Sequence, residues 1–130
     1  MTFGLWQGRA FPGYRLANEP NTLVRNDLVT PRAKPARDFY ASVFGFTLDG
    51  NPTLPDLDFT FLRRQDGYEI GGIMGLADAK SLWATTFEVV DTDATLARAG
   101  STVPPEDTPY GRSATLTDPF GVEFSVIARP

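Results

Sequence analysis

The stretch VTPRAKPARDFYASVFGF, residues 29–46, carries the clearest local pattern in this 130-residue chain. Pro35 fits the first turn of a helix, where its missing backbone N–H is not needed, and Gly45 is of a residue type that commonly ends a helix. Between them, apolar side chains recur at the spacing of one helix face: Ala36, Phe39, Tyr40, Val43 and Phe44. We predict an amphipathic helix that ends at residue 44 and packs these side chains in the core.

Strand-like segments flank this helix. TLVRNDLVT, residues 22–30, precedes it, and three segments follow it: FTLD at 46–49, LDFTFLRRQ at 57–65 and YEIGGIMG at 68–75. The run from Gln65 to Tyr68 signals a hairpin between the last two segments. Gly71-Gly72 indicates a bulge or a close approach of another backbone. The order is β-α-β-β-β.

The same order recurs from residue 83. WATTFEVV, 83–90, alternates as a half-buried strand, and Asp91 can cap a short helix, DATLARA, that ends at Gly100. STVPP, 101–105, is expected as a short strand or an extended edge, because two prolines exclude a central strand. GRSATLT, 111–117, and VEFSVIA, 122–128, are expected as strands joined by a type I turn at 118–121. Two such units predict an internal duplication.

The composition narrows the classes of function. The chain has 12 basic and 16 acidic residues, a net charge of −4 and a pI near 4.7, which argues against nucleic-acid binding. It has no cysteine, which excludes thiolate catalysis, and no histidine, which removes the usual general base and the commonest metal ligand. No signal-peptide pattern and no membrane-length apolar run are visible. We expect a soluble cytoplasmic protein that binds neither nucleic acid nor membrane.

Three segments carry a family resemblance: VTPRAKPARDFYASVFGF, FEVVDTDATLARA at 87–99 and PYGRSATLTDPFGVEFSVI at 109–127. Together they resemble the vicinal oxygen chelate superfamily, which includes glyoxalase, bleomycin-resistance and extradiol dioxygenase proteins. With NEPNTLVRNDLVT at 18–30 they look most like a hydroxylase-like or glyoxalase-like branch in which two domains often occur in tandem. The resemblance covers about residues 18–128. It implies an α+β fold of two βαβββ units that form a curved mixed sheet around a cleft.

The expected organisation is a single domain, residues 21–130, with units at approximately 21–76 and 82–129. Residues 1–20 form an N-terminal extension whose aromatic side chains are too many for a solvated tail: Phe3, Trp6, Phe11 and Tyr14. We expect this extension to pack on its own domain or on a partner subunit, and a partly ordered linker is the alternative. Because relatives place two domains in one chain, the resemblance implies that this chain forms a homodimer.

In metal-binding members of the family, side chains from both units converge on one ion. The resemblance places these positions on Arg25, Ala84 and Ser125, with a fourth within residues 68–75, where Glu69 is the only possible ligand. A guanidinium repels a divalent ion, alanine has no donor atom and serine is a poor ligand. We therefore expect no metal and no other cofactor. A metal site would need displaced carboxylates such as those of Asp27, Glu88 or Glu123.

Strand alternation places several polar side chains on the same face as these positions. The predicted ligand-binding residues are Arg25, Asp27, Thr86, Glu88, Tyr110, Glu123 and Ser125. Arg25 would clamp a carboxylate or phosphate, and Tyr110 would stack on the ligand. Three alternatives stay open: Arg25 and Asp27 pair with each other, Glu123 is exposed to solvent, and Tyr110 packs its own loop.

The residues favour metal-free binding of a small organic molecule in the cleft, which resembles the resistance or sequestration proteins of the superfamily. The first alternative is a metal-dependent glyoxalase-like lyase or dioxygenase-like or hydroxylase-like enzyme. The second is an assembly module with a vestigial cleft, for which the cleft would be small, occluded or entirely aliphatic. The sequence favours a binding protein over an enzyme, and it identifies no catalytic residue.

Overall fold

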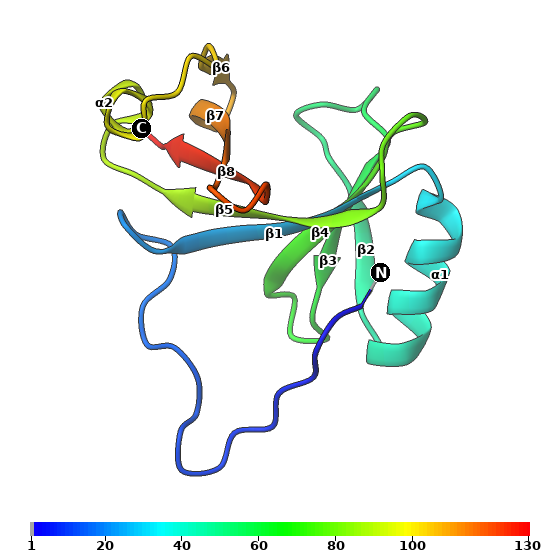
Figure 1. Ribbon diagram of the computed structural model, residues 1–130. Helices are drawn as coiled ribbons and strands as arrows, with labels where there is room; N and C mark the ends of the chain where they lie inside the picture. Colours follow the sequence, from blue (N-terminus) through cyan, green and yellow to red (C-terminus); the bar gives the residue numbers. More distant parts are fainter. Residues whose placement is uncertain (1) are drawn as a thin grey trace.

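The computed structural model describes residues 2–130, in which one βαβββ order occurs twice (Figure 1). The first unit contains β1 (Leu23–Thr30), α1 (Ala33–Phe44), β2 (Thr47–Gly50), β3 (Phe59–Arg63) and β4 (Glu69–Gly75). The second contains β5 (Leu82–Glu88), α2 (Thr92–Ala99), β6 (Glu106–Thr108), β7 (Gly111–Thr117) and β8 (Glu123–Ala128).

All eight strands form one sheet, in the order β2-β3-β4-β1-β5-β8-β7-β6. Read outward from the centre, both halves have the same arrangement, β1-β4-β3-β2 and β5-β8-β7-β6. Each half begins with a parallel pair, and the halves meet through the antiparallel pairing of β1 with β5. The predicted α+β fold of two units in a curved mixed sheet is confirmed (Figure 1).

Each helix covers one face of its own half of the sheet. α1 packs on β4 and β2, and α2 packs on β7 and β8. The first core contains Leu28, Ala33, Tyr40, Leu62 and Ile73, and the second contains Leu96, Ala114, Leu116 and Val126. Because each half has its own core, the other face of the sheet is free to line a cleft. Neither helix along residues 2–130 is long and apolar enough to cross a membrane.

The helix α1 ends where the sequence predicted, but part of its apolar stripe lies elsewhere. Gly45 follows in the left-handed conformation, with φ of 68°. Tyr40 is buried and Phe44 packs against the core, whereas Phe39 is 48% exposed and Val43 is 55% exposed. The prediction that Phe39 and Val43 are core residues is therefore wrong. Phe39 directly precedes Tyr40, and Val43 directly precedes Phe44. Because successive residues of a helix are rotated by about 100° around its axis, Phe39 and Val43 point away from the core.

In the second unit, the short strand that was one of two alternatives for residues 101–105 is absent. Residues 101–105 form no strand, and β6 begins only at Glu106, because Pro104 and Pro105 cannot donate backbone hydrogen bonds to a neighbour. The predicted cap of α2 is confirmed, since the Asp91 Oδ1 accepts a hydrogen bond of 2.9 Å from the Ala94 N–H.

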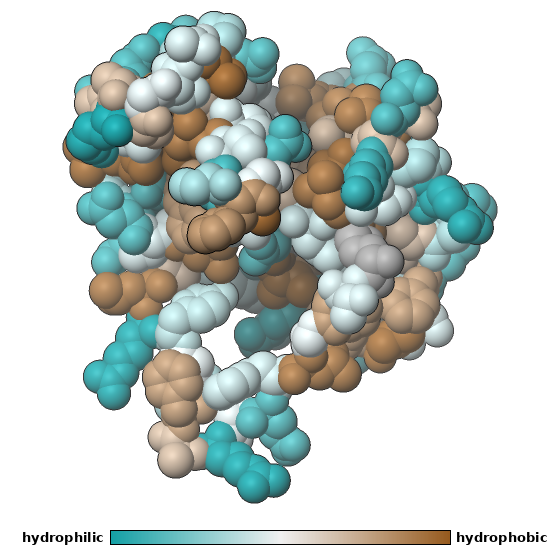
Figure 2. All heavy atoms as spheres, viewed as in Figure 1, coloured by the Kyte–Doolittle hydropathy of each residue, from teal (hydrophilic) through white to brown (hydrophobic). Residues whose placement is uncertain are grey.

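The N-terminal extension is attached to the domain at both ends. The Phe3 ring lies 5.7 Å from that of Tyr40 and 6.2 Å from that of Phe44, and the Asn18 N–H donates to the Leu23 carbonyl at 3.0 Å. Between these points the extension arches away from the body of the molecule (Figure 2). The arch exposes large apolar side chains: Leu5, Trp6, Phe11, Tyr14 and Leu16. Its contact with a partner subunit stays a prediction.

Candidate functional site

A cleft of about 1060 Å³ lies on the sheet face that the two cores leave free. Alternation along the strands explains its lining. On β3, Phe59 and Phe61 face the cleft while Leu62 faces the core, and on β8, Ser125 faces the cleft while Val126 faces the core. Both units contribute lining residues. The cleft is neither small nor entirely aliphatic, so it lacks the features that a vestigial cleft would have.

Five of the seven predicted ligand-binding residues line this cleft: Arg25, Asp27, Thr86, Tyr110 and Ser125. Strand register brings three of them into one row, because Arg25 pairs with Thr86 and Thr86 pairs with Ser125. Ala84 lies two pairs further along, opposite Asp27. The centre of the cleft therefore presents one guanidinium and two hydroxyl groups.

Glu88 and Glu123 do not line the cleft, which corrects their predicted placement. Glu88 is buried, and its carboxylate pairs with Arg129, whose guanidinium also donates to the Asn18 carbonyl at 2.9 Å. Glu123 is exposed at the start of β8, as one of the open alternatives held. Alternation assigns the strand face of a residue, but it does not show how far a cleft extends along the strand.

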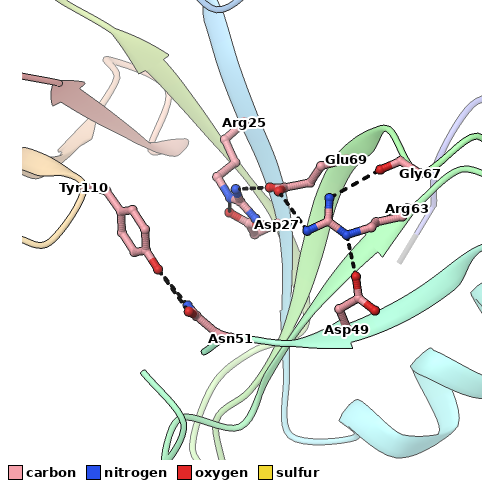
Figure 3. Close-up of polar contacts among 8 residues, drawn as sticks. All are labelled: Arg25, Asp27, Asp49, Asn51, Arg63, Gly67, Glu69 and Tyr110. Carbon is pink, nitrogen blue, oxygen red and sulfur yellow. Dashed lines mark hydrogen bonds and ion pairs between the residues drawn. The ribbon is translucent and has the colours of Figure 1, made fainter. Parts of the chain in front are cut away.

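The guanidinium of Arg25 is held on several sides at once (Figure 3). Its Nε donates to the Asp27 Oδ2 at 2.6 Å, and its Nη1 donates to the Glu69 Oε1 at 2.6 Å. The guanidinium carbon lies 5.5 Å and 5.4 Å from the ring centroids of Phe59 and Phe61, within cation–π distance. Its Nη2 is buried without a hydrogen-bond partner among residues 2–130. The alternative in which Arg25 pairs with Asp27 is thus observed, and sequence reasoning missed Glu69 as the second partner.

A β-bulge in β4 brings Glu69 into the cleft. Leu62 of β3 pairs with Gly71 of β4. The next residue of β3, Arg63, pairs with Glu69, which leaves Ile70 as the extra residue. Regular alternation would have turned Glu69 towards the core face instead. The bulge that the two consecutive glycines indicated is therefore present, and it supplies the second carboxylate for Arg25.

The pair of glycines also makes room for the aromatic wall. A Cβ on Gly72 would lie 2.1 Å from the Phe59 Cζ and 2.9 Å from the Asp27 Oδ1, both closer than packed atoms allow. The predicted close approach of another backbone is confirmed at Gly71, where a Cβ would lie 2.2 Å from the Asn26 carbonyl oxygen, whereas the neighbours of Gly72 are side chains. Gly72 is thus required for the Phe59 ring to lie where it does.

Ion pairs continue from Arg25 across four strands and form what we call the charge ladder (Figure 3). Its members, in order across β1, β4, β3 and β2, are Asp27, Arg25, Glu69, Arg63 and Asp49. The successive nitrogen–oxygen distances are 2.6, 2.6, 3.8 and 2.5 Å. Three carboxylates and two guanidinium groups give the ladder a net charge of −1. Burial, together with the charge of Glu69, raises the pKa of Asp27 above its ordinary value despite the opposing effect of Arg25.

Tyr110 connects the two units across the cleft (Figure 3). The Asn51 Nδ2 donates to the Tyr110 hydroxyl at 2.8 Å, and Asn51 is itself buried in the loop after β2. The Asn51 Oδ1 accepts the backbone N–H groups of Thr53 and Leu54 at 3.0 Å and 3.3 Å, which fixes the loop. Sequence reasoning missed this contact, and no local pattern indicates it. That Tyr110 stacks on a ligand stays a prediction.

The residues at the centre of the cleft do not fit a divalent cation. An ion near Arg25 would meet a permanent positive charge and the neutral hydroxyl groups of Thr86 and Ser125. The nearby carboxylates, Asp27 and Glu69, are already bound to the guanidinium. Within the described part of the chain, no three His, Cys, Asp or Glu side chains are grouped so that they could hold a metal ion.

Comparisons with known proteins give the same family and fold. The family model of the Glyoxalase/Bleomycin resistance protein/Dioxygenase superfamily matches residues 22–126. "Putative glyoxylase CFP32" of Mycobacterium tuberculosis (strain CDC 1551 / Oshkosh) is 36% identical over an alignment of 132 positions, which covers 95% of this chain and 50% of that protein. "Anthracycline biosynthesis protein DnrV" of Streptomyces peucetius is 33% identical over an alignment of 134 positions, which covers 96% of this chain and 48% of that protein. The chain spans about half the length of these relatives.

Solved structures share the fold at lower identity. A glyoxalase/bleomycin resistance protein/dioxygenase superfamily member from Vibrio splendidus 12B01 has a TM-score of 0.61 and 20% identity, over 84% of this chain and 100% of that chain. A variant of homoprotocatechuate 2,3-dioxygenase from Brevibacterium fuscum has a TM-score of 0.58 and 20% identity, over 82% of this chain and 32% of that chain. At these identities the likeness concerns the fold alone.

Proposed function

Because this chain belongs to the glyoxalase/bleomycin resistance protein/dioxygenase superfamily, we propose that it binds a small organic molecule in its cleft without a metal ion. The observation that carries the proposal is the guanidinium of Arg25, which occupies the centre of the cleft with Asp27 and Glu69 bound to it. A cleft of about 1060 Å³ has room for a molecule of drug size.

The proposed ligand contacts are Arg25, Asp27, Thr86, Tyr110 and Ser125. The hydroxyl groups of Thr86 and Ser125 make no side-chain hydrogen bond with residues 2–130, whereas the neighbouring Thr85 and Ser113 hydroxyls are bonded within the sheet. Thr86 and Ser125 can therefore donate to and accept from a ligand. The names of two relatives, a glyoxylase and an anthracycline biosynthesis protein, support small-molecule chemistry at this fold.

Two measurements test metal-free binding. In the first, protein treated with EDTA is titrated calorimetrically with Mn²⁺, Fe²⁺ and Zn²⁺, and we expect no saturable heat. In the second, aromatic and aliphatic metabolites of each charge class are screened by thermal shift with EDTA present. A molecule that binds the native state raises the melting temperature, and EDTA should not abolish the shift.

Two results would contradict the proposal in different ways. A stoichiometric metal bound between the two units, or a ligand that binds only after metal is added, would favour the glyoxalase-like or dioxygenase-like enzyme. It would require Asp27 and Glu69 to leave Arg25. A screen without any shift in all classes would favour the assembly module.

We further propose that two copies of the chain pair through the arch of the N-terminal extension. The arch exposes Leu5, Trp6 and Phe11, and the curated relatives contain about as much chain again beyond the matched half. A second copy would then cover the apolar arch. Light scattering of the triple substitution Leu5→Ser, Trp6→Ser and Phe11→Ser should show a monomer where the unmodified chain shows a dimer. An unmodified chain that is monomeric at all concentrations would refute the pairing.

A further inference from the structure

The charges around the cleft leave no spare cation for an anionic ligand. Arg25 is shared by Asp27 and Glu69, and the other lining arginine, Arg129, is bound to the buried Glu88. The lining also includes the exposed carboxylate of Asp107, which pairs with Arg112 outside the lining. The lining arginines are thus outnumbered by carboxylates. An anion that enters the cleft would lose its hydration without gaining a free guanidinium.

Aromatic and aliphatic side chains form a large part of the cleft lining. Phe59 and Phe61 stand edge to face, with centroids 5.1 Å apart, and the other lining aromatic rings are those of Tyr14, Tyr68 and Tyr110. Leu54, Leu57 and Ile70 add aliphatic surface. Rings prefer offset or edge-to-face contacts with other rings, so these walls suit a planar aromatic molecule. The volume of about 1060 Å³ exceeds what a single ring fills.

Two unbonded hydroxyl groups, those of Thr86 and Ser125, lie together on the second unit's side of the cleft, and on the first unit's side the Tyr68 hydroxyl is also unbonded within residues 2–130. Thr86 of β5 and Ser125 of β8 are adjacent in register and uncharged, and the aromatic wall is on β3 of the other unit. We infer that the cleft takes an uncharged or cationic fused-ring aromatic molecule with hydroxyl or carbonyl groups along one edge, and that it discriminates against anions. This inference rests on the proposed function, because it names the ligand class of the same cleft.

Three compounds that differ in one substituent test the inference. They are 1,8-dihydroxy-3-(hydroxymethyl)anthraquinone, which is neutral, its 3-aminomethyl analogue, which is cationic, and its 3-carboxylic acid analogue, which is anionic at pH 7. Calorimetric titration should show binding of the neutral and cationic compounds and roughly ten-fold or more weaker binding of the anion. Failure of all three to bind refutes the ligand class. The metal-free function then still stands if the thermal-shift screen has found a different ligand.

Substitutions that change the charge of the cleft test whether the cleft itself discriminates against anions. A difference in affinity that came from the compounds alone would be the same in every variant. Glu69→Gln removes one lining carboxylate, so the ratio of anion to cation affinity should rise roughly ten-fold, with the neutral compound little changed. Asp49→Asn removes the same charge at the far end of the charge ladder, outside the cleft lining, and should shift the ratio much less. If Glu69→Gln does not fold, Asp107→Asn takes its place in this test, because the Asp107 side chain is exposed. Equal ratios in all variants, or anion binding as tight as cation binding in the unmodified chain, would overturn the inference.

Discussion

The two halves of the sheet share one strand order, but they present different chemistry to the cleft. On the half formed by β1, β4, β3 and β2, the charge ladder and the Phe59–Phe61 wall contact each other. On the other half, β5 and β8 present the unbonded hydroxyl groups of Thr86 and Ser125. The first half binds most of its charged groups to one another, although the Arg25 Nη2 and the Asp27 Oδ1 have no hydrogen-bond partner among residues 2–130, whereas the second half leaves the Thr86 and Ser125 hydroxyl groups available. Substitutions in the first half should therefore change stability most, and those in the second should change binding with little effect on stability.

The largest effect is expected for Arg25→Ala. It leaves Asp27 and Glu69 close together without their cation, and Asp27 is mostly buried. Removing one partner of a fully buried ion pair costs about 3–5 kcal/mol, and because Arg25 keeps some exposure we expect a loss of about 2–3 kcal/mol in the free energy of unfolding. Urea denaturation measures this loss.

Arg112 provides the matched control in the second half. It also binds two carboxylates, those of Asp93 and Asp107, but all three side chains are more exposed than Arg25. Arg112→Ala should therefore change the free energy of unfolding little. Equal effects of the two substitutions would show that the two halves do not differ in the way we describe.

The next effect is expected for Gly72→Ala. The added Cβ would displace the Phe59 ring, and overpacking of this kind costs about 1–3 kcal/mol. Gly4→Ala is the control, because a Cβ there meets nothing within 4 Å. If urea denaturation shows the two variants to be equally stable, the close packing of Phe59 against β4 is wrong.

A smaller effect is expected where the two halves are joined, at Tyr110→Phe. The Asn51 Nδ2, which is buried, would lose its hydrogen-bond acceptor, at a cost of about 1 kcal/mol. Tyr68→Phe is the control, since Tyr68 also lines the cleft but its hydroxyl makes no hydrogen bond with residues 2–130. Thermal unfolding should lower the melting temperature for the first variant only. An unchanged melting temperature for Tyr110→Phe would show that the bridge does not hold the halves together.

The sequence predicted the fold well because the fold depends on local periodicity. The extent of α1, its end at Gly45 and the alternation of β8 are readable from neighbouring residues, although the exposure of Phe39 and Val43 on α1 was not. The charge ladder is not, because it depends on which strands become neighbours. It also depends on a bulge whose position within residues 68–75 decides the face of Glu69. The Asn51–Tyr110 bridge joins residues that are 59 positions apart, and only the assembled sheet brings them together.

The pH dependence of stability gives a finer test of the first half. A carboxyl group whose pKa is higher in the folded than in the unfolded chain binds more protons when folded, so its contribution to stability falls as the pH rises. Because the pKa of Asp27 is raised above 3.8, this fall should begin near pH 3.8 and end above the raised value. The free energy of unfolding of the unmodified chain, minus that of Asp27→Asn, should therefore decrease with pH across this window. Urea denaturation at a series of pH values measures it, and a difference that increases with pH would contradict the raised pKa.

The smallest effect on stability is expected in the second half, for Ser125→Ala and Thr86→Val. Neither hydroxyl takes part in a side-chain hydrogen bond of the described chain, so each variant should stay within about 0.5 kcal/mol of the unmodified protein in urea denaturation. Each should nevertheless weaken binding of the neutral anthraquinone several-fold, because a buried hydrogen bond to the ligand is lost. Ser113→Ala is the control, since the Ser113 hydroxyl already donates to the Val126 carbonyl at 3.2 Å. Ser113→Ala should lower the free energy of unfolding more than Ser125→Ala and Thr86→Val do, and it should weaken binding of the anthraquinone less. A loss of stability without a loss of binding for Ser125→Ala would mean that the second half, like the first, uses its polar groups to hold the sheet together.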